Sequence, residues 1–122
     1  MYHAIPIKKS LLKVSEQAVL NTILDFLTYR HIPHAHIRNT GAIVKKNDKI
    51  YFLKARNKQK GISDILGVCL GKAFAIEVKS AEGVVSEEQW EWLKAFEKAG
   101  GHACIARRLE DVEVFIQRLE SQ

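Results

Sequence analysis

Three charged residues stand within apolar segments near the middle of this 122-residue chain. Glu77 and Lys79 lie two apart in residues 73–79, where apolar side chains alternate with the two-residue period of a β-strand, so both point to the same face. Asp64 opens the preceding apolar run, residues 65–70, and a short turn separates the two runs. Such a pattern predicts a hairpin with Asp64 across from the end of the second strand. We therefore expect two carboxylates and an ammonium to converge.

These residue types are the ones that phosphodiester hydrolysis needs. Two converging carboxylates are hard oxygen ligands that leave a Mg²⁺ ion open positions for water and for a substrate phosphate. Such a cation polarises the phosphoryl oxygen and lowers the pKa of bound water, while a neighbouring lysine holds the attacking water and offsets negative charge in the transition state. In the alternative interpretation, Glu77 and Lys79 reach solvent at a strand end and Asp64 caps a loop.

Two predicted helices each bring one further polar candidate to this region. Ser15 is an N-cap for a helix that reaches about residue 30, and Glu16 lies one turn before Leu20 of its buried stripe. Ser86 starts a second helix and forms a capping box with Gln89, whose side chain also faces the sheet. The helix dipole explains an acid at position 16, and the capping box explains position 89. A structural role and a site role therefore both stay open for these two residues.

The elements follow one another as helix, three or four strands, helix, strand and helix. Residues 34–44 are extended but interrupted near 39–41, residues 50–55 form a further strand, and Gly71–Lys72 is the turn of the central hairpin. Residues 102–107 form the last strand. This order predicts an α/β fold around a mixed sheet, with helices on its faces. A final helix carries an apolar stripe made of Val112, Phe115, Ile116 and Leu119.

Length and composition indicate a single domain over residues 1–122, with a basic N-terminal arm at residues 1–14. The chain contains no apolar run long enough to span a bilayer, and its first residues lack the apolar region of a secretory signal. Cys69 and Cys104 are far apart and fit no metal motif, so we expect reduced thiols. We expect a cytoplasmic protein of a bacterium or a virus-infected cell, with no membrane partner and no nucleotide cofactor.

Basic residues exceed acidic ones and give a formal net charge of +5, which favours a polyanionic partner. The excess is concentrated just before Asp64, and a phosphate backbone is the natural ligand for such a cluster. The alternative is a solvated, lysine-rich loop. The cluster consists of Lys45, Lys46, Lys49, Lys54, Arg56, Lys58 and Lys60.

Three histidines, His31, His34 and His36, offer a different metal hypothesis. His34 and His36 share one face of a predicted strand, and imidazole is a common Zn²⁺ ligand. No cysteine or acid nearby completes the set, and exposed strand histidines explain the same pattern.

Several short motifs in this order resemble the VRR-NUC family, the virus-type replication-repair nuclease branch of the PD-(D/E)xK superfamily. They are RNTG (38–41), GISD (61–64), AIEVKS (75–80), VSEEQ (85–89) and GGHACIAR (100–107), with Glu16 upstream. The resemblance implies a restriction-endonuclease-like αβββαβ core, here with an extra C-terminal helix. It also implies Mg²⁺ or Mn²⁺ as cofactor. Ser63 stands where the superfamily name has proline, a residue that contributes no catalytic group.

The resemblance also implies roles for individual residues. Asp64 and Glu77 correspond to the metal-binding carboxylates, with the backbone carbonyl of Val78 as a further ligand, and Lys79 to the catalytic lysine. Glu16 corresponds to an acid near the metal or its water shell. Gln89 corresponds to a glutamine beside the active lysine. Arg38 and Asn39 are candidates for substrate binding, with the building of a turn as the alternative. The other substrate-binding candidates are Lys54, Arg56, Lys58 and Lys60.

Standalone members of this family resemble structure-specific endonucleases, and some resemble homodimeric resolvases of four-way Holliday junctions. The resemblance thus implies a metal-dependent DNA endonuclease that acts on branched DNA, as a homodimer if it makes paired cuts. One alternative is a flap or fork nuclease. The other is a nucleic-acid-binding module without catalysis.

Overall fold

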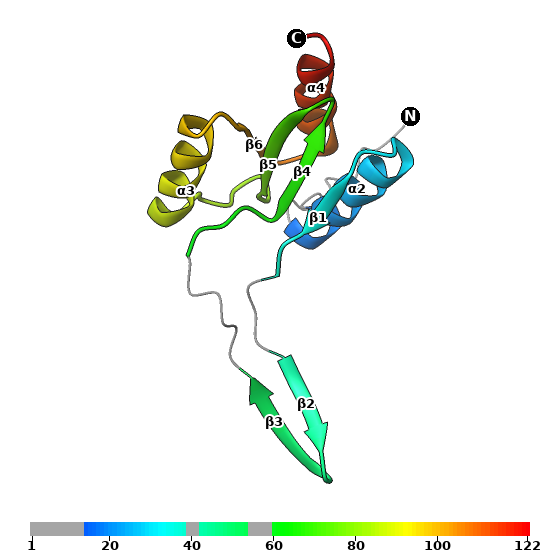
Figure 1. Ribbon diagram of the computed structural model, residues 1–122, viewed down its shortest axis with the longest axis vertical. Helices are drawn as coiled ribbons and strands as arrows, with labels where there is room; N and C mark the ends of the chain where they lie inside the picture. The colour runs from blue at the N-terminus through cyan, green and yellow to red at the C-terminus, as the bar shows by residue number, and fades with distance from the viewer. Residues whose placement is uncertain (1–13, 39–41, 54–59) are drawn as a thin grey trace, which may run out of the picture.

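The structure is a computed structural model that describes residues 14–38, 42–53 and 60–122 (Figure 1). Three helices and six strands lie within these ranges. In chain order they are α2 (Glu16–Tyr29), β1 (His34–His36), β2 (Ala42–Lys46), β3 (Lys49–Leu53), β4 (Ile65–Cys69), β5 (Lys72–Val78), α3 (Glu87–Lys98), β6 (His102–Ala106) and α4 (Leu109–Glu120).

Four of the strands form one mixed sheet in the order β1-β4-β5-β6. The pairs β1·β4 and β4·β5 are antiparallel, and β5·β6 is parallel because α3 crosses over between these two strands. The predicted α/β fold with a mixed sheet flanked by helices is confirmed, including the C-terminal helix. Strands β2 and β3 form a separate antiparallel pair that projects from the sheet in Figure 1.

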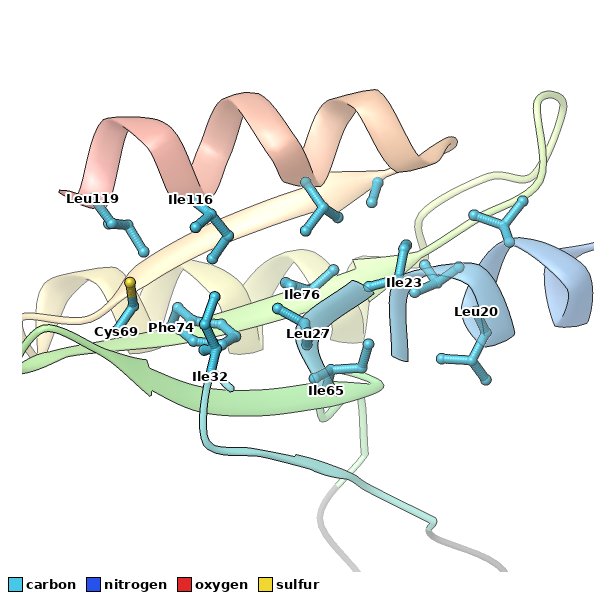
Figure 2. Close-up of a cluster of buried hydrophobic side chains, with 14 residues drawn as sticks. Leu20, Ile23, Leu27, Ile32, Ile65, Cys69, Phe74, Ile76, Ile116 and Leu119 are labelled. Carbon is cyan, nitrogen blue, oxygen red and sulfur yellow. The ribbon is translucent and has the colours of Figure 1, made fainter. Parts of the chain in front are cut away.

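Helices α2 and α4 share one hydrophobic core with the sheet (Figure 2). The N-cap prediction for α2 is confirmed, since Ser15 Oγ accepts a hydrogen bond from the Ala18 N–H at 3.1 Å. Helical spacing then turns the apolar residues of α2 and α4 toward the strands. Phe74 of β5 and Phe115 of α4 meet edge to face with ring centroids 6.2 Å apart. The fully buried members of the core include Ile23, Leu27, Ile65, Phe74, Ile76, Val78, Val112 and Ile116.

Strand β5 is central and is covered on both of its faces. Phe74, Ile76 and Val78 join the core under α2 and α4, whereas Ala75 and Glu77 point the other way yet are also buried. Gln89 of α3 contacts Glu77, so α3 covers this second face. A central strand between helical layers excludes water from both sides, and this is why an acid here becomes buried.

The turn of the β4–β5 hairpin lies one residue earlier than predicted. Cys69 pairs with Lys72, so the turn residues are Leu70 and Gly71, which both have positive φ values, 47° and 80°. Two-residue hairpin turns favour positive φ at both positions because this matches the twist of the strands. Lys72 instead belongs to β5, and its ammonium donates a hydrogen bond to the Leu119 carbonyl at 2.7 Å.

Within the part of the chain that the structure describes, no helix has the length and apolar character needed to cross a membrane.

We expect Leu27→Ala to lower the free energy of unfolding by about 2–5 kcal/mol, because this fully buried side chain leaves a cavity in the shared core. Tyr29→Ala is the matched control, since Tyr29 is 82% exposed two residues further along the same helix. Urea unfolding followed by circular dichroism measures both. Equal transition midpoints for the two variants would contradict this description of the core.

Candidate active site

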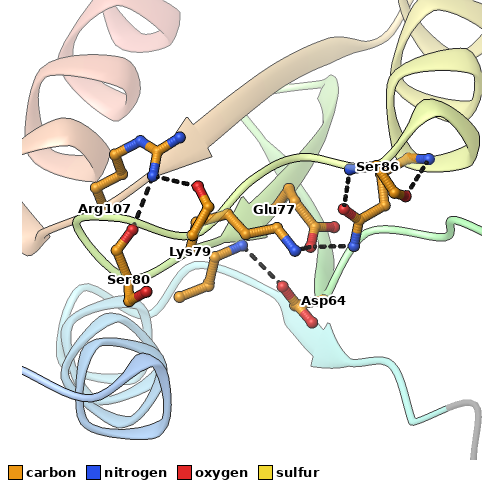
Figure 3. A network of polar contacts seen from close by, with 9 residues as sticks. Asp64, Glu77, Lys79, Ser80, Ser86 and Arg107 are labelled. Atoms are coloured by element: carbon orange, nitrogen blue, oxygen red, sulfur yellow. Dashed lines mark hydrogen bonds and ion pairs between the residues drawn. The ribbon is translucent and has the colours of Figure 1, made fainter.

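Asp64 and the end of β5 are brought together by the register of the β4–β5 hairpin. Ile65 pairs with Ile76, so Asp64 lies opposite the last residues of β5. Its Oδ2 accepts a hydrogen bond from the Val78 N–H at 2.7 Å (Figure 3). The predicted convergence of Asp64, Glu77 and Lys79 is therefore present in the structure, while their chemical roles stay predictions.

Glu77 is the most unusual residue of this region because it is an acid that is only 1% exposed. Its Oε1 accepts a hydrogen bond from Gln89 Nε2 at 2.9 Å and lies 3.7 Å from the Lys79 ammonium. Its Oε2 is buried without a hydrogen-bond partner. Among the described side chains only one other buried polar atom, Ser63 Oγ, shares that condition. A buried carboxylate oxygen without a donor is costly, and such an atom calls for a ligand.

Burial and, after it, the negative charge of nearby Asp64 raise the pKa of Glu77 to about 8. The Lys79 ammonium acts in the opposite direction, and Glu16 adds a smaller upward effect. Two carboxylates repel each other in a site that is shielded from water, so the pair keeps a proton until a cation binds beside it. The donor set therefore favours a cation.

Gln89 has both of the roles that its position suggested. Its N–H donates to Ser86 Oγ at 3.2 Å and its Oε1 accepts from the Ser86 N–H at 2.9 Å, which completes the capping box. Because the cap occupies Oε1, the amide group Nε2 is left pointing at Glu77 (Figure 3). Gly61 passes close by, and a Cβ there would lie 2.3 Å from the Glu88 carbonyl oxygen. Only glycine lets the loop before Asp64 approach the start of α3 this closely.

A cavity of about 390 Å³ opens beside the Asp64 carboxylate. Glu16 lines it from the exposed N-terminal turn of α2, so the predicted closeness of Glu16 to Asp64 is observed. His36 of β1 also lines it, although sequence reasoning did not place His36 in this site. The pairing of His36 with Ile65 carries it there, and no local pattern reports a pairing across so many residues. The cavity wall is formed by Glu16, Gln17, Leu20, His36, Asp64 and Val78.

The three histidines do not form the zinc site that was considered as an alternative. His34 Nδ1 lies 2.7 Å from the Ile32 carbonyl oxygen, while His36 belongs to the cavity beside Asp64. Over residues 14–38, 42–53 and 60–122, no group of three His, Cys, Asp or Glu side chains is placed to hold a metal ion.

Because no third such side chain joins Asp64 and Glu77, a cation at this site has at most two carboxylate ligands from the described residues. Two carboxylates, one with an orphaned buried oxygen, lie beside Val78, whose backbone carbonyl is the predicted third oxygen ligand. Mg²⁺ is usually held by one or two carboxylates and completes its shell with water and substrate phosphate. The residues present therefore fit Mg²⁺ or Mn²⁺, and Asp64, Glu77 and the Val78 carbonyl are the groups that would hold it.

Arg107 fixes the loop that follows Lys79. One of its terminal nitrogens donates to the carbonyl oxygens of Ser80 at 2.8 Å and Gly83 at 2.7 Å (Figure 3). The Lys79 N–H donates to the Ala106 carbonyl at 2.9 Å, which extends the β5–β6 pairing to the lysine itself. Sequence reasoning noted Arg107 only as part of a motif. Its role as a positioning residue depends on the parallel pairing of β5 with β6.

The predicted substrate-binding residues are only partly covered by the structure. Arg38 is exposed just after β1, and Lys60 is exposed beside Glu88 and Trp92 of α3. Outside the described residues lie the basic N-terminal arm up to residue 13 and Asn39, Thr40, Lys54, Arg56 and Lys58.

The sequence model of the VRR-NUC domain matches residues 13–108, which is most of the chain. The match contains every element from α2 to β6 and all the residues of the site. No curated protein matches the chain.

We expect the free energy of unfolding of the metal-free protein to fall as the pH rises from about 4.5 to about 8. The folded protein binds the Glu77 proton more tightly than the unfolded chain, in which the carboxyl has its ordinary pKa of 4.5. Stability from this proton is therefore complete below pH 4.5 and is lost as the pH passes the folded pKa. Urea titrations in chelator at pH 5.5 and 8.5 measure the loss.

Glu77→Gln supplies the comparison, because a neutral amide has no proton to lose over this range. Its midpoint should depend much less on pH than that of the parent, whereas Glu113→Gln, at an exposed position of α4, should behave like the parent. The same pH dependence in Glu77→Gln and the parent would show that Glu77 does not hold this proton.

Proposed function

Because the chain belongs to the VRR-NUC family, whose domain implies a nuclease of the PD-(D/E)xK type, we propose that it is a metal-dependent, structure-specific DNA endonuclease. The observation that supports this most strongly is the buried Glu77 carboxylate, which has one oxygen held by Gln89 and the other without a partner. Asp64 and Lys79 lie beside it, and the cavity lined by Asp64 has room for a phosphate.

Each residue contributes a separate function to this reaction. Gln89 holds the Glu77 carboxylate in one orientation, and the Val78 N–H does the same for Asp64. When bound, a divalent cation supplies positive charge that polarises the phosphoryl oxygen and makes water more acidic. The Lys79 ammonium, 12% exposed, is held near the carboxylates, where it orients the attacking water and offsets the charge of the transition state.

Lys79 and Glu77 are shielded from bulk water. Their side chains are 12% and 2% exposed, and β5 is buried on both faces up to Val78. Charges interact more strongly where water is excluded, so the cationic Lys79 has more effect here than on an open surface. Arg107 keeps the loop after Lys79 in place through its bonds to Ser80 and Gly83.

We further propose branched DNA as the substrate and a homodimeric Holliday junction resolvase as the first candidate. Two symmetric cuts across a junction need two active sites, and a two-fold dimer supplies them. A flap or fork nuclease is the second candidate, and a binding module without catalysis is the third. The convergence of Asp64, Glu77 and Lys79 with an unpaired buried oxygen favours catalysis over binding alone.

We expect cleavage of a labelled four-way junction in Mg²⁺ or Mn²⁺, no cleavage in chelator, and a loss of about 10²- to 10³-fold in rate for Lys79→Ala. Lys98→Ala is the matched control, because Lys98 is exposed in the last turn of α3. Duplex, single-strand, flap and fork substrates are tested beside the junction, with product sizes read from sequencing gels.

The pattern of cuts separates the candidates. Paired, symmetric incisions in the junction support the resolvase, and cuts near a single-strand branch support the flap or fork nuclease. Metal-independent binding without cutting on every substrate supports the binding module. Cutting that survives in Lys79→Ala would rule out the role given to this lysine.

A further inference from the structure

We propose that the β2–β3 hairpin is a DNA-binding arm with a phosphate-contacting face and a base-contacting face, an inference that rests on the proposed function. The hairpin consists of Ala42–Lys46 and Lys49–Leu53. Of its side chains, the structure describes those of residues 45–52, and none of these lines the cavity beside Asp64.

The hairpin is preformed by its turn. Asn47 and Asp48 both have positive φ values, 51° and 60°, which Asn and Asp tolerate better than most residues. A turn of this type matches the twist of two antiparallel strands, and five residue pairs follow it. At about 3.3 Å per residue, the five-residue strands give an arm about 17 Å long.

The register divides the arm into two faces. Lys46 pairs with Lys49, so their side chains and that of Tyr51, two residues on, share the first face. Lys45 pairs with Ile50, and these two share the second face with Phe52. Ile50 is 75% exposed and Phe52 68% exposed, while Tyr51 and the three lysines are exposed as well.

Within the described residues, no opposite charge neutralises the lysines of the first face and no apolar surface covers Ile50 and Phe52 on the second. Two lysines directly opposite each other repel and weaken the pair, and an isolated two-stranded hairpin is marginal in water. A polyanion relieves the repulsion, because phosphates neutralise lysines with release of counterions. Exposed Ile50 and Phe52 would also be covered by a second protein, but the cores of protein interfaces are depleted in lysine.

Branched DNA contains ligand groups for both faces of the hairpin. Its backbone supplies phosphates for Lys46 and Lys49, and its unstacked bases at the branch supply flat apolar surfaces. Proteins insert apolar side chains between bases in this way, and aromatic side chains stack on unpaired ones. Phe52 and Ile50 are suited to such contacts, so the arm recognises the branch rather than the base sequence.

The position of the arm connects it with the catalytic residues. It is inserted between β1 and β4, and Figure 1 shows it projecting from the end of the sheet where β1 ends and β4 begins. His36, the last residue of β1, and Asp64, just before β4, both line the cavity described above. DNA held along the arm is therefore led to the edge of the sheet that carries the acids.

The test measures binding of the full chain to fluorescent four-way junction and to duplex by anisotropy, in chelator and over a range of salt. The measurement needs no cleavage, so it tests DNA binding by the hairpin even if the protein does not cut DNA. The first variant, Lys46→Ala with Lys49→Ala, should bind both DNAs about tenfold more weakly, with a slope of log affinity against log salt smaller by about 2. Lys94→Ala with Lys98→Ala removes the same charge from the exposed face of α3 as a control.

The second variant, Ile50→Thr with Phe52→Thr, keeps strand-forming residues but removes the apolar face. It should lose the preference for junction over duplex while its salt slope stays that of the parent. Equal affinities and slopes for the parent and both hairpin variants would overturn the proposal. So would a change from dimer to monomer in the second variant, by analytical ultracentrifugation, with unchanged affinity per active chain, because the apolar face would then belong to a second copy.

Discussion

The whole site depends on keeping one acid, Glu77, away from water at the end of a strand that is buried on both faces. An isolated buried charge is so unfavourable that the group takes up a proton instead, and the pKa of Glu77 is raised accordingly. The fold tolerates this because the Gln89 amide and the Lys79 ammonium satisfy one carboxylate oxygen. The other oxygen is left for a ligand that the protein alone does not supply.

Three local structures fix the groups around Glu77, and each follows from a short piece of sequence. The two-residue turn at Leu70 and Gly71 sets the register that puts Asp64 against Val78. The capping box at Ser86 uses the oxygen of Gln89 and leaves its nitrogen directed at Glu77. Beyond the strand, Arg107 binds the loop after Lys79. The bonds that end these elements therefore also orient the polar groups of the site.

The sequence alone was sufficient to predict which polar groups converge, because this geometry is local. Asp64, Glu77 and Lys79 lie in one hairpin, where alternation and a tight turn determine which side chains meet, even though the turn was placed one residue late. Gln89 was ambiguous because its structural and site roles are compatible. His36 and Arg107 were missed, since each reaches the site through strand pairings between distant segments. The hairpin of β2 and β3 was predictable from its turn residues, but the separation of its two faces required the register.

The most direct test of this account is the binding of Mn²⁺ to the metal-free protein, measured by isothermal titration calorimetry at one fixed pH. The parent, Glu77→Gln, Asp64→Asn and the exposed Glu113→Gln are compared, with circular dichroism to confirm that each is folded. If the buried carboxylate oxygen is reserved for a cation, the parent and Glu113→Gln bind Mn²⁺ with equal affinity, and the two site variants bind at least tenfold more weakly. Binding of equal strength in Glu77→Gln and the parent would contradict the account.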